Sequence, residues 1–519
     1  MSEEKFKDLA TGLYWKGKKT EVDRVVLPFQ TIETINESRA TREREKVKGQ
    51  SLFKNQSGGN WYNRLIWGDN KYIMASLLEE FAGKIDLIYI DPPFATGADF
   101  SVKMTLGDAE WTKEPSAIEE KAYRDTWGQG LDSYLQMVYD RLVLMRGLLR
   151  NTGTIYIHLD SHVSHYMKVA LDEIFGVDNF LNDISWCYRG YEHNRSYWNR
   201  KHDSILYYAK VKDNCFFNPD AVRENLSNVT IKKYKYEDGK GKYRIRGKNI
   251  KDSPIKQQTD LSHEDEKIYP GLTYRQYITG GTLPRDWFVI DYVNQAANEK
   301  LDFPTQKPEV LIEKFIKASS NKGDLVADFF CGSGTTGAVA EKLGRRWIMA
   351  DLGRYAIHTT RKRLLGIDNC KPFVVQNLGK YERQYWQGVT FKKRSDEQMP
   401  IHEYIQFILK LYNAEPLTGM LHIHGKKGKH FVHVGAVDAP VTLTEIKEAM
   451  DEVKQAGQKA LDILGWEWEM GLHNVVEKAA KESGIHLRLL SIPRDVMDQR
   501  AVEKGDVTFY ELAYLEVDI

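Results

Sequence analysis

The stretch Ile85-Asp86-Leu87-Ile88-Tyr89-Ile90-Asp91-Pro92-Pro93-Phe94 decides the fold of this chain. Its first part is short, almost wholly apolar and rich in β-branched residues, which predicts a buried strand of a parallel sheet. Because proline has no backbone N–H group and a fixed φ, the two prolines end this strand in a rigid turn. Ligands of open α/β sheets bind just beyond the carboxyl ends of the strands, so the turn lies where chemistry is expected.

The residue types of this turn suit a reaction at a planar amino group. The exocyclic amine of a base is a poor nucleophile, because its lone pair is delocalised into the ring. Asp91 and the backbone oxygen of Pro92 can accept its two hydrogen atoms, and Pro93 keeps the turn rigid. Phe94 can stack on a base that has turned out of a helix. A strand that simply ends in a Pro-Pro turn explains these four residues equally well.

A second strand and turn lie far along the chain. Leu325-Val326-Ala327-Asp328-Phe329-Phe330 predicts a buried strand, and Cys331-Gly332-Ser333-Gly334-Thr335-Thr336-Gly337 predicts a glycine-rich turn into a helix. Glycine lets the backbone approach a ligand, and amide N–H groups at a helix start favour a carboxylate or polar tail. The next strand ends at Asp351, where a nucleotide-like cofactor presents its ribose hydroxyls. Taken alone, the turn fits NAD, another nucleotide or simple packing.

Together, these stretches resemble the motifs of amino-group DNA methyltransferases. Asp91-Pro92-Pro93-Phe94 resembles the catalytic motif of the adenine-N6 enzymes, and Phe330-Cys331-Gly332-Ser333-Gly334 resembles their cofactor loop. Here the catalytic motif comes first, which is similar to the permuted beta group that includes the modification subunits of type III restriction systems. Pro304-Thr305-Gln306-Lys307-Pro308 matches the helix-opening motif of that group. Asn63-Arg64-Leu65-Ile66-Trp67-Gly68-Asp69-Asn70 resembles the lead-in of type III subunits.

The resemblance implies S-adenosylmethionine as cofactor and transfer of its methyl group to the N6 atom of an adenine turned out of the duplex. Asp91 and Pro92 would hold the amine and Phe94 would stack on the base. The residues expected to contact the cofactor are Asp69, Thr305, Lys307, Asp328, Phe330, Cys331, Gly332, Gly334, Thr335 and Asp351. For Asp69, a helix N-cap is an equal alternative. Cys331 is expected to be a small packed residue rather than a nucleophile.

The same resemblance predicts the domain organisation. The fold class is α/β, a doubly wound Rossmann-like sheet in permuted order with an inserted target-recognition domain and a small C-terminal α/β domain. We expect an N-terminal arm over residues 1–60 and the catalytic half over 61–185. A target-recognition insert follows over 186–280, then the cofactor half over 281–379. Residues 380–519 form the C-terminal domain. It contains no recognisable catalytic motif and is expected to support docking or dimerisation.

The insert is strongly basic, although the whole chain has a formal net charge of only +1. Between Arg195 and Lys256 there are 16 basic and 7 acidic residues, interleaved with aromatic side chains. Such a local excess is expected to face phosphates, with a solvated charged loop as the alternative. The residues expected to contact DNA are Arg195, Arg200, Lys201, Lys232, Lys233 and Lys235.

Composition sets further limits. With 42% hydrophobic and 28% charged residues, the chain is typical of soluble globular proteins. The four cysteines form no CxxC pair, which predicts neither disulfides nor a zinc site and fits a reducing cytoplasm. We find no signal peptide and no apolar run long enough for a bilayer, so no membrane partner is expected. Methyl transfer from a sulfonium needs no metal, so no metal is expected at His158, Asp160, His162 and His165.

Several alternatives and partners stay open at this point. Cytosine-N4 methyltransferases use the same geometry, but their motif usually begins with Ser, so Asp91 argues against them. An RNA or protein-amide target is disfavoured by the long basic insert. An alternative from a different class is a DNA-reading specificity subunit, whose own catalysis is incidental to that of a nuclease or helicase partner. Double-stranded DNA is the expected substrate, and a homodimer and a restriction or helicase subunit are the expected protein partners.

Overall fold

The computed structural model describes residues 12–37, 61–93, 102–106, 109–113 and 131–512, the last range with short gaps. The gaps are at residues 191–195, 197, 252, 256–259, 279, 295–296, 298, 302, 304, 392–398, 470–475, 477–478, 481, 498–501, 503–504 and 506. Among the described residues, no helix combines the length and hydrophobicity that a membrane span requires.

A ten-stranded sheet forms the centre of the molecule, in the order β1-β16-β2-β15-β14-β3-β6-β8-β7-β13. Its strands are β1 (Gln30–Ile35), β16 (Phe373–Asn377), β2 (Asn63–Trp67), β15 (Arg346–Asp351), β14 (Leu325–Asp328), β3 (Ile85–Ile90), β6 (Leu149–Leu159), β8 (His202–Ala209), β7 (Phe180–Cys187) and β13 (Trp287–Val289). From β16 to β6 all neighbours pair in parallel. The last strand in sequence of the cofactor half thus lies beside the first strands of the catalytic half, as the permuted order predicts.

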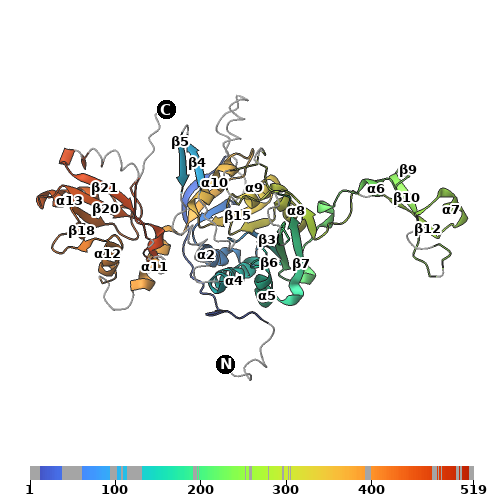
Figure 1. Cartoon of the computed structure of the whole chain (residues 1–519), viewed down its shortest axis with the longest axis horizontal. Coiled ribbons are helices and arrows are strands. Elements are labelled where there is room, and N and C mark those ends of the chain that lie inside the picture. Colours follow the sequence, from blue (N-terminus) through green and yellow to red (C-terminus); the bar gives the residue numbers. More distant parts are fainter. Residues whose placement is uncertain are drawn as a thin grey trace, which may run out of the picture.

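Helices cover both faces of this sheet, which confirms the doubly wound α/β fold (Figure 1). One face packs on α2 (Asn70–Phe81), α4 (Leu131–Leu148) and α5 (Ser164–Phe175). The other face packs on α8 (Glu309–Ser319), α9 (Thr335–Lys342) and α10 (Arg354–Leu365). Successive strand residues alternate between these two cores, so a strand such as β3 is buried along its whole length. This double burial explains why its sequence is a nearly continuous apolar run.

Strand β3, which leads to Asp91, lies between β14 and β6. Leu87 pairs with Val326 and Ile88 with Ala327, so two halves that are far apart in sequence meet at this strand. Asp86 closes the junction, since its Oδ2 accepts a 2.9 Å hydrogen bond from the amide of Leu325. The other oxygen of Asp86 forms a 2.6 Å ion pair with Arg150 at the start of β6. A buried carboxylate thus ties the three central strands together.

The predicted recognition insert starts later than expected. Residues of β7 and β8 pair within the central sheet, so the boundary predicted at residue 186 is wrong. Their aromatic side chains are part of the sheet core rather than of a DNA-reading module. A short turn, η2 (Val177–Asn179), precedes β7, and the turns η3 (Lys212–Asn214) and η4 (Pro219–Val222) follow β8.

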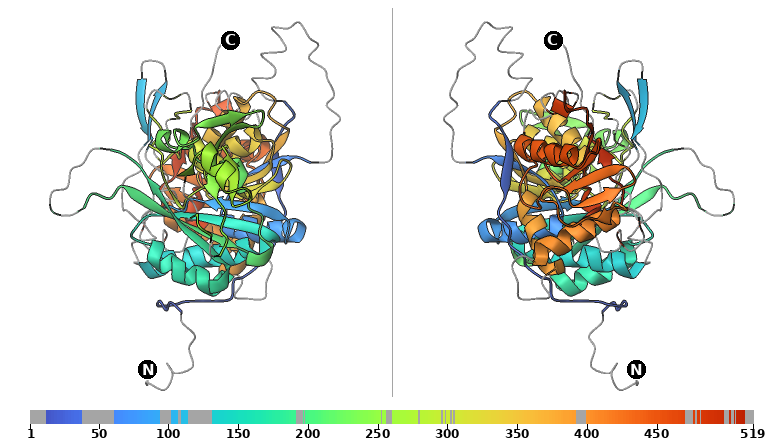
Figure 2. Two further views of the ribbon diagram at one scale, coloured as in Figure 1. Left: turned by 90° about the vertical axis from the view of Figure 1, so that its right-hand side faces the viewer. Right: turned by 90° about the vertical axis from the view of Figure 1, so that its left-hand side faces the viewer.

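Beyond these turns the chain forms a separate small sheet, which lies at the end of an extension from the body (Figure 1). This recognition arm contains α6 (Asn228–Ile231), β9 (Tyr236–Asp238), β10 (Gly241–Gly247), β11 (Asp260–Leu261), α7 (His263–Ile268) and β12 (Thr273–Tyr277). Strand β10 is central and pairs antiparallel with the other three strands. A β-hairpin of β4 (Val102–Leu106) and β5 (Ala109–Lys113) projects from the body in both views of Figure 2.

The C-terminal unit is an α/β domain with its own sheet, in the order β17-β18-β19-β20-β21-β22. Its elements are α12 (Met399–Leu411), β17 (Glu415–Pro416), β18 (Gly425–Lys427), β19 (His430–Val434), α13 (Leu443–Gln455), β20 (Ala460–Gly465), β21 (His486–Ser491), η5 (Arg494–Met497) and β22 (Tyr510–Glu511). Helix α11 (Gly379–Phe391) leads into it, so the boundary predicted at residue 380 falls inside a helix.

The N-terminal segment is more ordered than an arm. Residues 12–37 run along the body, bury Trp15 and Leu27, and supply the edge strand β1, which pairs antiparallel with β16. The remainder of the predicted arm, residues 1–11 and 38–60, lies outside the described residues.

Replacing Asp86 with alanine is expected to weaken the junction of the two halves. The buried amide of Leu325 would lose its acceptor, which costs about 2 kcal/mol of unfolding free energy. Asp86→Asn is the matched control, because its amide oxygen can still accept from Leu325 and only the ion pair with the half-exposed Arg150 is lost. Urea denaturation followed by circular dichroism measures both variants. Equal stability of Asp86→Ala and the native chain would contradict this role.

Candidate active site and nucleic-acid interface

Asp91 stands at the carboxyl end of β3, followed by the buried Pro92 and the half-buried Pro93. Its Oδ2 forms an ion pair with the Nζ atom of Lys307. Its Oδ1 is buried and has no hydrogen-bond partner among the described residues. A buried acceptor without a donor is costly, and such an atom therefore points to a ligand that supplies one. Phe94, the fourth residue of the predicted catalytic motif, lies outside the described residues.

Lys307 connects the catalytic strand with the glycine-rich loop. It is buried just before α8, and its backbone oxygen accepts a hydrogen bond of 3.3 Å from Thr335 Oγ1. The cofactor contact predicted for Lys307 stays a prediction, and its ammonium group pairs with the Asp91 carboxylate. No local pattern could reveal this pair, because its partners are 216 residues apart. Thr305 lies half-buried in the turn that precedes α8.

The glycine-rich loop runs from β14 to α9 and is held by the end of β15. Gly332 and Gly334 have φ values of +50° and +73°, a region that favours glycine. The amides of Gly332 and Gly353 donate 2.8 Å hydrogen bonds to the two carboxylate oxygens of Asp351. Asp351 therefore fixes the loop, and its predicted contact with a ribose stays a prediction. A Cβ atom on Gly334 would lie 2.6 Å from the Thr360 side chain, so the loop tolerates no larger residue there.

Three predicted cofactor residues turn their side chains into the protein. Asp328 accepts hydrogen bonds from the Phe330 amide and from Thr336 Oγ1, at 3.0 and 2.6 Å. Burial raises the pKa of Asp328 to about 7, although these two hydrogen bonds lower it. Cys331 packs in the core, and burial raises the pKa of its thiol well above the usual range, which fits a packed residue and not a nucleophile. Their part in the site is to shape the loop.

The third of these residues is Thr335, whose hydroxyl bonds to Lys307 and accepts from Arg363 Nη1 at 2.9 Å. Phe330 is half-buried and packs against the core that contains α2 and α4. The ring of Phe303, which the sequence did not single out, would lie 3.3 Å from a Cβ on Gly332 and stacks on Tyr355. Most of the loop is buried, and only Phe330 and Gly332 are half-buried.

Asp69 caps helix α2, as the alternative reading of the sequence had it. Its Oδ1 accepts 2.8 Å hydrogen bonds from the Lys71 amide and from Arg141 Nη2. Burial favours a higher pKa for Asp69, but Arg141, the Lys71 amide and Arg494 outweigh it and lower the pKa below its usual value. The neighbouring Asn70 donates a 2.7 Å hydrogen bond to the Phe329 carbonyl and so also holds the glycine-rich loop.

A buried network of side-chain hydrogen bonds connects β3 with its neighbouring strands. Tyr89 OH bonds to His158 Nδ1 at 2.9 Å, and His158 Nε2 lies 3.1 Å from Asp203 Oδ2. Tyr188 OH donates to the other oxygen of Asp203 at 3.2 Å. The sequence had suggested only that His158 lies at a strand end. The network joins β3, β6 and β8 and so fixes the strand that carries Asp91.

The predicted DNA contacts divide between two places. Arg200 and Lys201 lie in the β7–β8 connection at the same edge of the sheet as Asp91, and Arg200 Nη1 bonds to His162 Nε2 at 2.8 Å. Trp198 beside them is 95% exposed. Lys232, Lys233 and Lys235 are exposed at the base of the recognition arm. Arg195 lies outside the described residues.

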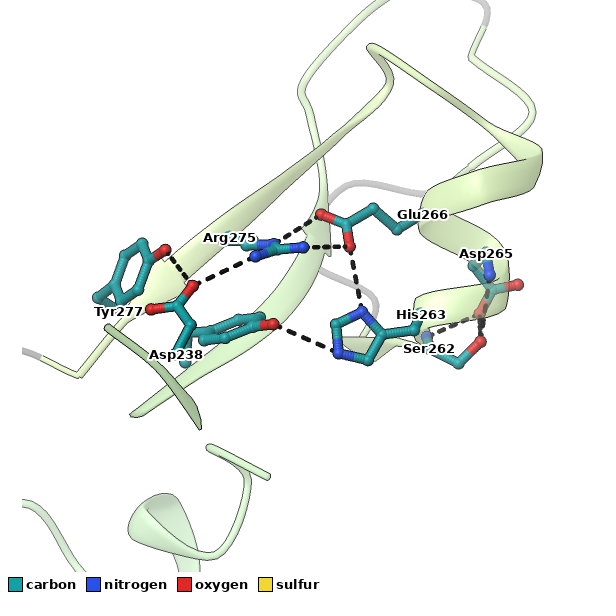
Figure 3. Close-up of polar contacts among 8 residues, drawn as sticks. Asp238, Ser262, His263, Asp265, Glu266, Arg275 and Tyr277 are labelled. Carbon is teal, nitrogen blue, oxygen red and sulfur yellow. Dashed lines mark hydrogen bonds and ion pairs between the residues drawn. The ribbon is translucent and has the colours of Figure 1, made fainter. Parts of the chain in front are cut away.

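The two faces of the recognition arm carry different polar networks. On one face Arg275 donates to both carboxylate oxygens of Glu266 in α7, at 2.9 and 3.1 Å, and to Asp238 (Figure 3). His263 of α7 extends this network through a 3.2 Å contact with Glu266. The neighbouring strand positions alternate, so the opposite face carries Lys242, Arg244, Arg246, Tyr274 and Gln276. There Arg244 and Arg246 bond to Gln276 and pair with Asp260, and their side chains are 14% and 13% exposed. Lys242, Arg244 and Arg246 belong to the basic stretch that the sequence indicated, whereas Tyr274 and Gln276 lie beyond it.

A comparison with protein families decides the identity. Residues 85–362 match the family model N6_N4_Mtase, which is described as DNA methylase. The chain belongs to this family of DNA methylases. The match extends from β3 to α10 and includes the recognition arm, the Lys307 motif and the glycine-rich loop.

Individual relatives are DNA-modifying enzymes of several systems. The type II methyltransferase M.EcaI of Enterobacter cloacae is 30% identical over 331 residues, which are 58% of this chain and 69% of that protein. The StyLTI Mod subunit of a type III restriction-modification enzyme of Salmonella typhimurium is 28% identical over 56% of this chain and 51% of its own length. The DNA adenine methyltransferase YhdJ of Escherichia coli K12 is 26% identical over 66% and 95%, respectively. The chain thus spans about half of the Mod subunit.

The methyl donor of this DNA methylase is S-adenosylmethionine, and the site fits it. The cofactor carries a positive sulfonium, and the carboxylates of Asp91, Asp328 and Asp351 all lie around the glycine-rich loop. The buried Oδ1 of Asp91 has no donor among the described residues and faces this same edge of the sheet. When bound, the cofactor supplies an electrophilic methyl group. The loop backbone from Phe330 to Gly334 would hold it, next to Asp351.

Asp328 predicts a pH dependence of stability. Its pKa is about 7 in the folded state, against about 4 in the unfolded chain. The carboxyl therefore stabilises the fold below pH 4, and this contribution of up to about 4 kcal/mol is lost as the pH rises through 7. The isosteric variant Asp328→Asn has no such titration and should gain stability relative to the native chain between pH 4 and pH 8. Urea denaturation at both pH values measures this gain, and parallel pH profiles would contradict it.

Proposed function

We propose that this chain is a site-specific DNA methyltransferase that transfers the methyl group of S-adenosylmethionine to the N6 amino group of adenine in double-stranded DNA. We further propose that it is the modification component of a cytoplasmic restriction-modification system. The names of its relatives support both points, since they include Mod subunits and an adenine methyltransferase. Several relatives are Mod subunits of restriction-modification enzymes. We therefore also propose a homodimer and a restriction or helicase subunit as protein partners.

One observation carries the proposed reaction. The Oδ1 atom of Asp91 is a buried acceptor that has no donor among the described residues, and it stands at the end of β3 beside the rigid Pro92. An adenine amine offers two hydrogen atoms, which Asp91 Oδ1 and the Pro92 carbonyl can accept together. Lys307 meanwhile holds the other oxygen of Asp91, so the carboxylate keeps one orientation.

The residues then act by positioning and electrostatics. Hydrogen bonds from the amine to Asp91 and Pro92 draw its nitrogen towards tetrahedral geometry and direct its lone pair at the methyl carbon. When bound, the cofactor would supply the methyl group, and its sulfur would keep the electron pair of the broken carbon–sulfur bond, which leaves S-adenosylhomocysteine. The amine nitrogen would thereby gain positive charge, and the negative charge of Asp91 would stabilise it until the nitrogen gives a proton to water. Phe94 is proposed to stack on the base, by resemblance.

Replacing Asp91 with alanine should abolish methyl transfer and leave DNA affinity nearly unchanged. We expect a loss of at least about 1000-fold in rate, because both the acceptor and the charge at the developing cation disappear. Modification-sensitive sequencing of DNA from cells that express the native chain or Asp91→Ala measures the product. Methyladenine at one short motif, absent in the variant, supports the proposal. Methylation that persists in the variant would contradict the role of Asp91, and modified cytosine would contradict the choice of base.

The face of the recognition arm that carries Lys242, Arg244 and Arg246 should contact DNA. Replacing Arg244 and Arg246 together with glutamine should weaken binding and reduce the slope of log affinity against log salt by about 2. Arg275→Gln is the control, because it removes one positive charge from the opposite face of the same sheet. Fluorescence anisotropy with a DNA duplex at several salt concentrations measures both variants. An equal loss of affinity in both variants would mean that the fold of the arm, and not this face, determines binding.

A further inference from the structure

The C-terminal unit touches the main body through Arg494 in η5. The guanidinium group of Arg494 forms an ion pair with Glu382 of α11, and both side chains are largely buried. Its Nη1 and Nη2 atoms also lie 3.8 and 3.9 Å from the place where a Cβ atom on Gly68 would stand. A residue of the C-terminal unit is thus packed directly on the turn that follows β2.

This turn, formed by Gly68 and Asp69, lies next to the cofactor loop. The amide of Gly68 donates a 3.0 Å hydrogen bond to the backbone oxygen of Asp351, and Trp67 Nε1 donates to the Leu352 oxygen at 3.0 Å. Asp351 in turn holds the amide of Gly332. A shift of the Gly68–Asp69 turn would therefore be transmitted to the glycine-rich loop through one residue.

Arg494 stands between two carboxylates. Burial raises the pKa of the Glu382 carboxyl and the charge of Asp69 adds to this effect, whereas Arg494 lowers the pKa of both Glu382 and Asp69. Arg141 pairs with Asp69 from the side of α4, and Lys71 pairs with Asp140 rather than with Asp69. Without Arg494, the buried Glu382 would lose its ion-pair partner at the domain junction, while Asp69 would keep Arg141.

Helix α11 makes this junction firm. Its Tyr385 ring packs edge-on against Tyr72 of α2 with centroids 5.9 Å apart, and Tyr381 packs on the same core. On the other side Arg383 donates to the Val437 oxygen at 2.8 Å and pairs with Glu467 at 2.9 Å. Helix α11 therefore packs on the core of the main body and also binds the C-terminal unit through Arg383.

We propose that Arg494 is a positioning residue of the S-adenosylmethionine site, so that the C-terminal unit is an integral part of the catalytic body. Its guanidinium group neutralises Asp69 and Glu382 and presses the Gly68–Asp69 turn against Asp351. This inference rests on the proposed function, since it concerns the same cofactor. It assigns to residues outside the matched family region, 85–362, a part in cofactor binding. The sequence had assigned this unit only to docking or dimer support.

Calorimetric titration of the full-length chain with S-adenosylmethionine and with S-adenosylhomocysteine tests the inference without turnover. Arg494→Met should raise the Kd of both ligands about tenfold, as expected for the loss of a charged hydrogen bond that orders the site. Arg494→Lys should restore part of the affinity. With saturating cofactor, kcat should change far less than the KM for S-adenosylmethionine.

Arg488→Met is the matched control. It breaks the buried pair between Arg488 and Asp462 inside the C-terminal sheet and therefore destabilises the same unit without touching the junction. It should lower the melting temperature and leave cofactor affinity unchanged below that temperature. An equal loss of affinity in Arg488→Met would overturn the inference, because general weakening of the unit would then explain the effect.

A charge exchange gives the second test. The double variant Glu382→Arg with Arg494→Glu returns a cation to the space beside Asp69, now from α11, and should bind the cofactor more tightly than Arg494→Met. Unchanged affinity in Arg494→Met would overturn the inference alone. No binding of S-adenosylmethionine to the native chain would overturn the proposed function together with it.

Discussion

The pairing of β3 with β14 is the contact on which the rest of the structure depends. It joins Leu87 to Val326 and Ile88 to Ala327, and Asp86 seals it by accepting from the Leu325 amide. Since both strands are parallel, their carboxyl ends reach the same edge of the sheet. The turn after one carries Asp91, and the turn after the other is the glycine-rich loop. The buried ion pair of Lys307 and Asp91 also joins the two halves of the chain, at the carboxyl ends of these strands.

Negative charge is concentrated at this edge, and its arrangement suits a cationic methyl donor. Asp91, Asp328 and Asp351 surround the loop, but they differ in their partners. Burial raises the pKa of Asp328 to about 7, while Asp351 accepts hydrogen bonds from two backbone amides. Only Asp91 retains an oxygen without a donor among the described residues. Asp328 and Asp351 thus hold the loop, whereas Asp91 offers a hydrogen-bond acceptor to a substrate.

The fold was predictable because its signals are local. Apolar runs such as Ile85–Ile90 predict strands that are buried on both faces, and the glycine-rich turn predicts the start of α9. The limits of the recognition insert were not predictable, because the aromatic and basic residues around β7 and β8 look alike in a sheet edge and in a DNA-reading module. The pairs of Lys307 with Asp91 and of Arg494 with Glu382 escaped prediction since they join distant parts of the chain.

The central claim is that Asp91 Oδ1 and the Pro92 carbonyl receive the amine of a target adenine. The most direct measurement is a crystal structure of the full chain with S-adenosylhomocysteine and a DNA duplex that contains the modified motif. The account predicts an adenine turned out of the duplex, with its N6 atom within hydrogen-bond distance of both oxygens and pointing at the sulfur. A stacked adenine, or one whose amine contacts neither oxygen, would contradict it.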